Sequence, residues 1–109
     1  MAPTYKIIYS AEAQKQIDDI LDYFLDEHSL SLAVKMQHAF LDAVEKAAKM
    51  PTAYPLERKF KSKTDIPYRR IVTKSYAFVY KIVEVIDSII VVRVYHVKVN
   101  TKFFKEDLP

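Results

Sequence analysis

Residues 68–98 read YRRIVTKSYAFVYKIVEVIDSIIVVRVYHVK and alternate apolar and polar residues through most of their length. Such alternation is typical of β-strands, and it predicts three strands, near 68–74, 76–85 and 89–98. Short turn signals separate them, at Lys74-Ser75 and Asp87-Ser88. Because connections this short join antiparallel neighbours, we expect an antiparallel meander in this part of the chain.

The upstream half of the chain changes from strand to helical periodicity. Residues 4–9 are rich in β-branched and aromatic residues and predict a short strand. Ser10 is a good N-cap for a helix whose apolar positions continue to His28, and Ser31 is expected to cap a second helix that Pro51 ends. Two amphipathic helices joined by a few residues indicate an antiparallel helical hairpin, and its apolar faces need the sheet as a partner.

The predicted order of elements is therefore β-α-α-β-β-β. This is an α+β fold, with the helical hairpin packed on one face of a small antiparallel sheet and the other face left free for function. The chain has 109 residues, of which 50% are apolar, so residues 1–109 are expected to form one domain with a real core.

Cysteine and glycine are both missing, and their absence excludes several functions. The chain has no cysteine, which rules out disulfides, thiolate nucleophiles and thiolate zinc sites. It has no glycine, which rules out the P-loop, the dinucleotide fingerprint and the nucleophile elbow, so we expect no cofactor and no metal. No stretch approaches the roughly 20 apolar residues of a membrane span, and the first residues lack a signal-peptide layout. A cytoplasmic protein without membrane contact is expected.

The charge is distributed unevenly along the chain. Residues 1–50 contain 5 Lys and Arg against 8 Asp and Glu, whereas residues 51–109 contain 12 against 6, so the net charges are −3 and +6. Residues 51–67 carry three prolines, no clear periodicity and a run of cations, and long loops of this kind are often functional. The basic half is where an anionic partner is expected to bind, and the alternative is an ordinary solvated surface.

Five short pieces of the sequence together resemble the RelE/ParE superfamily of toxins from type II toxin–antitoxin systems. In order along the chain they are YSAEA (9–13), MPTAYP (50–55), YRRI (68–71), SYAFVY (75–80) and VVRVYHV (91–97). The resemblance covers nearly the whole chain. It implies a cognate antitoxin partner that wraps the toxin with an extended, helical segment. It also implies one of two targets, because RelE-like and YoeB-like members cleave mRNA on the ribosome without metal, whereas ParE-like members poison DNA gyrase.

Metal-free RNA cleavage needs a base, an acid and cations that stabilise the phosphorane, and histidine and arginine suit these roles. His96 lies where YoeB-like members carry a histidine in an Arg-Tyr-His context, and Arg70 lies at the family's spacing before Tyr76. We therefore expect His96 and Arg70 to be the catalytic pair. The alternatives are a hydrogen-bonded strand-end residue for His96 and an ion pair, for example with Glu84, for Arg70. The expected phosphate-binding cations are Arg58, Arg69, Lys98 and Lys102.

The sequence departs from the nuclease pattern at two positions. Ala77 stands where cleaving members commonly carry arginine, and Val97 stands where YoeB-like members have tyrosine. Glu57 in the basic loop is a candidate general base if the loop folds over the site, or else a solvated partner of a neighbouring lysine. Three hypotheses remain open: a ribosome-associated mRNA endonuclease, which is narrowly favoured, a DNA gyrase inhibitor, and a detoxified binding module.

Overall fold

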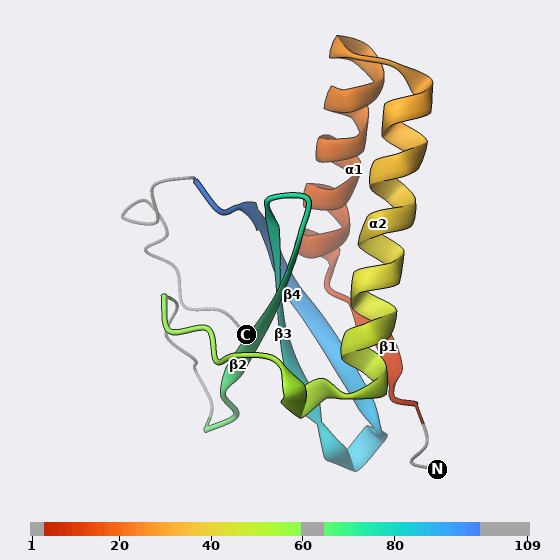
Figure 1. Ribbon diagram of the computed structural model, residues 1–109. Coiled ribbons are helices and arrows are strands. Elements are labelled where there is room, and N and C mark those ends of the chain that lie inside the picture. The colour runs from red at the N-terminus through yellow and green to blue at the C-terminus, as the bar shows by residue number, and fades with distance from the viewer. Residues whose placement is uncertain (1–3, 60–64, 99–109) are drawn as a thin grey trace.

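The computed structural model describes residues 4–59 and 65–98 (Figure 1). It contains four strands, two α-helices and two short 3-10 helices within these residues. In chain order they are β1 (Lys6–Tyr9), α1 (Ala11–Glu27), α2 (Leu30–Lys49), η1 (Pro51–Ala53), β2 (Tyr68–Thr73), β3 (Tyr76–Val83), η2 (Glu84–Ile86) and β4 (Ser88–His96). The predicted α+β fold and its element order are confirmed.

The four strands form one sheet in the order β1-β4-β3-β2. The two pairs in the meander, β2–β3 and β3–β4, are antiparallel as expected. β1 pairs with β4 in parallel, so the sheet is mixed rather than wholly antiparallel. The physical reason is the long connection between these two strands, which carries the helical hairpin and lets the chain return in the same direction.

Serine hydroxyls begin both helices. The Ser10 Oγ accepts a hydrogen bond from the Ala13 backbone N–H at 3.0 Å, as the sequence predicted. The second cap is Ser29 rather than Ser31, because its Oγ accepts from the Leu32 N–H at 3.1 Å and α2 begins two residues earlier than expected. Pro51 comes one residue after the end of α2, beyond the C-cap Met50, and begins η1, which is consistent with its predicted role as a helix stop.

The main core lies between the helical hairpin and one face of the sheet. Figure 1 shows both helices on the same side of the sheet, with their connected ends extending beyond it. Phe40 of α2 packs edge-to-face on Phe78 of β3 at 5.0 Å between ring centroids and on Tyr76 at 5.5 Å. Val44 and Ala47 of the same helix are buried beside them. These contacts hold the hairpin against the strands that carry the site residues.

The other sheet face is also packed, which corrects the expectation that it is free. A second cluster of buried side chains lies there, and it consists of Tyr68, Ala77, Val79, Val92 and Tyr95. Glu57 adds to this packing, because its Oε2 accepts a hydrogen bond from the Tyr95 hydroxyl. The loop that follows η1 pairs with the outer edge of β2 through an isolated bridge between Leu56 and Arg69. We call residues 55–57 the strap.

A bulge in β4 changes which residues face the helices. Val79 lies opposite Arg93 and Tyr80 opposite Val91, so Val92 is an extra residue in the ladder. Val92 therefore belongs to the second cluster, whereas Val94 belongs to the core under the helices. In an uninterrupted strand Val92, Val94 and His96 would share one face by alternation, and the bulge moves Val92 to the other face.

α1 covers the part of β4 that extends past β1. The Val94 N–H donates to the Gln16 Oε1 at 2.7 Å, and Arg93 forms a 3.0 Å ion pair with Glu12 in the first turn of α1. The Ser10 N–H donates to the Val91 carbonyl at 2.9 Å. The helix thus supplies partners that a longer β1 would have supplied.

We expect Phe40→Ala to lower the free energy of unfolding by about 3–5 kcal/mol, because it empties a site where 3% of the side chain is exposed. Urea denaturation measures this change. The neighbouring Leu41 is 47% exposed, so Leu41→Ala is the matched control and is expected to cost no more than about 1 kcal/mol. Equal losses for the two variants would contradict this view of the core.

Candidate functional site

His96 lies at the end of β4, on the side of the sheet that carries the helices. It is opposite Tyr76 in the ladder, and the two rings meet edge-on at 5.1 Å between centroids. Tyr76 in turn packs on Phe24 and Phe40 of the two helices. The His96 Nδ1 accepts a hydrogen bond from the Lys98 N–H at 3.1 Å, which leaves Nε2 as the protonated nitrogen of the neutral ring.

Arg70 lies on the opposite face of the sheet. It pairs in β2 with Val79, a member of the second cluster, and its Nη1 is 4.0 Å from the Glu57 Oε2. The suggested ion pair with Glu84 does not form, because that carboxylate accepts from the Tyr5 hydroxyl and Arg70 faces Glu57. The structure therefore does not bring Arg70 and His96 together.

A closed polar network surrounds Glu57, which is 5% exposed. The Tyr95 hydroxyl donates to its Oε2 at 2.7 Å, and the Lys59 N–H donates to its Oε1 at 2.9 Å. The Lys59 Nζ also lies 5.5 Å from the centroid of the Tyr95 ring. Glu57 is thus neither a solvated partner of a lysine nor an open general base, because each of its oxygens already accepts a hydrogen bond.

The Tyr95 hydroxyl keeps its proton at neutral pH. The pKa of Tyr95 is raised from 10.0 to about 12, chiefly by burial and also by the hydrogen bond to Glu57, with Arg70 partly offsetting both effects. A phenol in this state donates to the carboxylate and does not act as a base. Sequence reasoning missed Tyr95 because it singled out the adjacent histidine. The alternation of faces along the last strand could have pointed to Tyr95, because it places Tyr95 beside Ala77.

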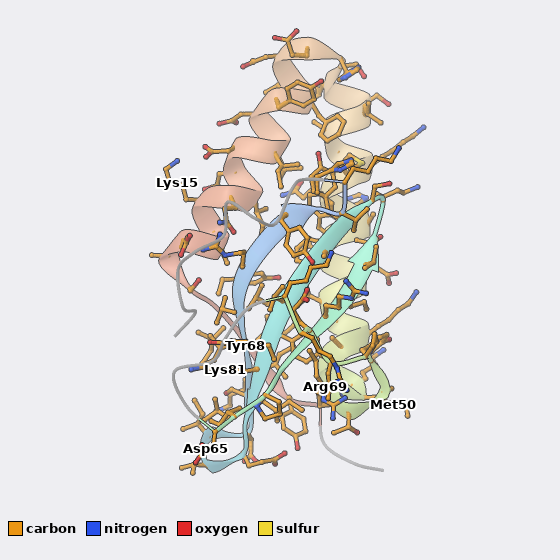
Figure 2. All side chains as sticks on the ribbon, turned by 90° about the vertical axis from the view of Figure 1, so that its left-hand side faces the viewer. Lys15, Met50, Asp65, Tyr68, Arg69 and Lys81 are labelled. Carbon is orange, nitrogen blue, oxygen red and sulfur yellow. The ribbon has the colours of Figure 1, made fainter. Side chains whose placement is uncertain are left out.

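The Arg69 side chain makes hydrogen bonds to backbone carbonyls of its own chain. Its Nη1 donates to the Tyr54 carbonyl at 2.7 Å and to the Thr52 carbonyl at 3.4 Å. Figure 2 labels this side chain near Met50, where α2 ends. The Tyr80 hydroxyl donates to the Pro51 carbonyl at 2.6 Å, so β2 and β3 together hold the start of the loop. Burial raises the pKa of Tyr80 to about 12.

Two of the three remaining predicted cations are exposed, and the third is not among the described residues. Arg58 and Lys98 are exposed, so both remain available to an anionic partner. Lys102 lies outside the described residues. Lys81 adds a half-exposed cation that the sequence analysis did not single out, and Figure 2 shows it beside Tyr68 on the face away from the helices.

Among the described residues, no three His, Asp or Glu side chains are grouped closely enough to hold a metal ion. A hollow of about 120 Å³ lies between α1 and α2, and Asp18 is its one ionisable lining residue besides Tyr9. Neither helix in this part of the chain is long and apolar enough to cross a membrane.

Comparisons with known proteins agree with this architecture. Residues 7–100 match the family model described as the ParE toxin of the type II toxin–antitoxin system parDE. A solved structure titled "Chromosomal ParDE TA system from P. aeruginosa" superposes with a TM-score of 0.66 at 12% identity, covering 87% of this chain and 98% of that one. No curated protein matches the sequence. The fold and the family model define a toxin of a type II toxin–antitoxin system. The chain belongs to the ParE toxin family.

We expect Tyr95→Phe to lower the free energy of unfolding by about 1–3 kcal/mol, because it leaves the buried Glu57 carboxylate with one donor fewer. In a double-mutant cycle, Tyr95→Phe and Glu57→Gln are expected to couple by at least about 0.5 kcal/mol. Arg58→Ala, at the exposed neighbouring position, serves as the control and is expected to change stability by no more than about 0.5 kcal/mol. Additive effects in the cycle would show that the two side chains do not interact.

Stability is expected to fall as the pH rises from about 10 to about 12. The pKa values of Tyr80 and Tyr95 are raised from 10.0 to about 12, so the unfolded chain loses these protons at lower pH than the folded one. The two tyrosines contribute their full stabilisation below pH 10, and this stabilisation is lost as the pH rises through their folded-state pKa values of about 12. Urea unfolding at a series of alkaline pH values measures this slope, and Tyr95→Phe is expected to make it shallower. An unchanged slope would contradict the assignment.

Proposed function

We propose that this toxin acts by binding DNA gyrase and inhibiting it, without cleaving RNA. The observation that carries the proposal is the placement of Arg70 and His96 on opposite faces of the sheet. An acid–base residue and a phosphate-binding cation must reach the same scissile phosphate. Two side chains separated by a packed sheet do not meet that requirement, whereas inhibition through a binding surface has no such need.

The environment of Arg70 supports the same conclusion. The Glu57–Tyr95–Arg70 network is closed and mostly buried. Ala77 is fully buried between Val72 and Tyr95, so the position that commonly carries arginine in cleaving members contributes packing alone. In the part of the chain that the structure describes, the sheet face away from the helices therefore offers neither a free base nor the expected second arginine.

The rival function is ribosome-associated mRNA cleavage. One observation favours it: the His96 ring is only partly buried, and the exposed Lys98 lies two residues further on. Gyrase and the ribosome both place the toxin in the cytoplasm, and under either proposal the cognate antitoxin is the partner that holds it inactive. The alternative of a detoxified binding module predicts no effect on growth when the toxin is expressed without its antitoxin.

We expect the purified toxin to inhibit DNA supercoiling by gyrase, and His96→Ala to inhibit as well as the wild type, because binding does not use an acid–base group. A supercoiling assay with relaxed plasmid measures both. Arg58 is an exposed cation, so Arg58→Ala is the matched variant that tests whether the charge of the basic half contributes to inhibition.

The same preparations should leave mRNA intact on translating ribosomes. Cleavage by the wild type that disappears in His96→Ala would replace this proposal with the endonuclease. Expression in cells that alters neither growth nor supercoiling would favour the detoxified module instead.

A further inference from the structure

The hollow between α1 and α2 combines polar and apolar side chains in a small space. Gln14 and Asp18 of α1 and Gln37 of α2 contribute polar groups to its lining, and Phe40 and Leu41 of α2 contribute apolar surface. Figure 1 shows the two helices side by side above the sheet. The volume of about 120 Å³ is well below the roughly 300 Å³ at which pockets for drug-sized ligands begin. The hollow therefore has room for a single side chain and not for a nucleotide.

Asp18 is the charged group of this hollow, and its carboxylate is only partly engaged. The Gln14 Nε2 donates to its Oδ1 at 3.0 Å. Among residues 4–59 and 65–98, no donor reaches the other oxygen, Oδ2. The nearby Lys15 does not neutralise Asp18, because its Nζ forms a 2.8 Å ion pair with Asp19. An exposed carboxylate with an open oxygen beside apolar surface suits a ligand that has a cationic tip on an apolar stem.

The surroundings of the hollow are also negatively charged. α1 carries six Asp and Glu residues against one lysine. Burial raises the pKa of Tyr9, another lining residue, and the charge of Glu45 on α2 raises it as well, so Glu45 adds negative potential on this side of the hairpin. The Lys46 Nζ is held by Asp42 at 3.0 Å. A cationic group is therefore attracted to the hollow, and an anionic one is repelled.

Arginine is the cationic side chain that fits this lining best. Its three-carbon stem can lie on the apolar surface of Leu21 and Leu41, and its planar guanidinium has five N–H donors for the Asp18 carboxylate and the side-chain carbonyl of Gln37. Lysine offers three donors around a point charge. Arginine is also enriched among the few side chains that contribute most of the binding energy of protein interfaces.

We propose that an arginine side chain on the surface of DNA gyrase enters this hollow and pairs with Asp18. An enzyme that binds DNA presents Lys and Arg side chains along the path of the phosphates, and the acidic α1 is complementary to such a surface. The basic half of the toxin is suited to an anionic partner, so the hollow serves a partner of the opposite charge. This inference rests on the proposed function and adds which surface of the toxin meets gyrase.

Two neighbouring aspartates allow a matched test with purified gyrase and the full-length toxin. Asp18→Asn removes the charge in the hollow, whereas Asp19→Asn removes the same charge one residue away, outside the lining. Titration calorimetry measures the affinity of each variant for gyrase. We expect Asp18→Asn to weaken binding about tenfold and Asp19→Asn to change it by no more than about twofold. Equal weakening by both substitutions would assign the effect to the overall charge of α1 and overturn the inference, and so would wild-type affinity in both.

A small probe tests the hollow without gyrase. We expect N-butylguanidinium at millimolar concentrations to shift the NMR signals of the Gln14 and Gln37 side-chain amides in the wild type. We expect no such shifts in Asp18→Asn, or with the uncharged N-butylurea. Shifts that are absent, or that are equal for the two probes, overturn the cationic specificity of the site.

The same variants separate this inference from the proposed function. If the wild-type toxin and Asp18→Asn inhibit supercoiling equally, the hollow is not the site of contact and gyrase remains the target. If the wild type neither binds nor inhibits gyrase, the proposed function fails and gyrase is excluded as the source of the arginine. An Asp18→Asn variant that binds gyrase normally but binds the antitoxin more weakly assigns the hollow to the antitoxin and overturns the inference.

Discussion

β3 is buried on both of its faces, and this constraint sets the position of every candidate residue on the sheet. Phe78 and Tyr80 pack under the helices, whereas Ala77 and Val79 belong to the second cluster. A residue on β2 or β4 takes the face of its β3 partner. A slip of one residue would exchange the two sets between the faces and place each against the wrong partners, so the core fixes the register strongly. The separation of Arg70 from His96 is therefore a consequence of packing, and a rotation of side chains does not remove it.

The structure also changes how the positive charge of the second half of the chain is understood. Arg69 holds loop carbonyls, Arg70 faces the buried carboxylate of Glu57, and Arg93 pairs with α1. Burying Glu57 costs several kcal/mol unless donors compensate, and they come from three parts of the chain. The main effect of this network is to fix the position of the strap, and its net contribution to stability is smaller. The net charge of +6 thus overstates the charge available to a ligand, because these arginines are used within the fold.

The parts of the fold that depend on local periodicity could be predicted from the sequence. The helical hairpin, the three meander strands and the Ser10 cap all follow from patterns within a few residues. The parallel pairing of β1, the bulge at Val92 and the burial of Glu57 could not be, because each depends on partners far along the chain. Tyr95 and Glu57 are 38 positions apart. Ser29 and Ser31 are equally good caps by composition, and only the packing of α2 decides between them.

The outer edge of β2 shows how a protein with a strand at the end of its sheet can limit self-association. Unpaired strand edges are templates for aggregation, and natural sheets protect them with proline, with charge or with a covering segment. All three devices occur on β2, because Pro55 ends the pairing of the strap, the strap covers the first half of the strand, and Arg70 and Lys74 lie beside the remainder. Like charges on two copies of the chain oppose their pairing edge to edge at this strand.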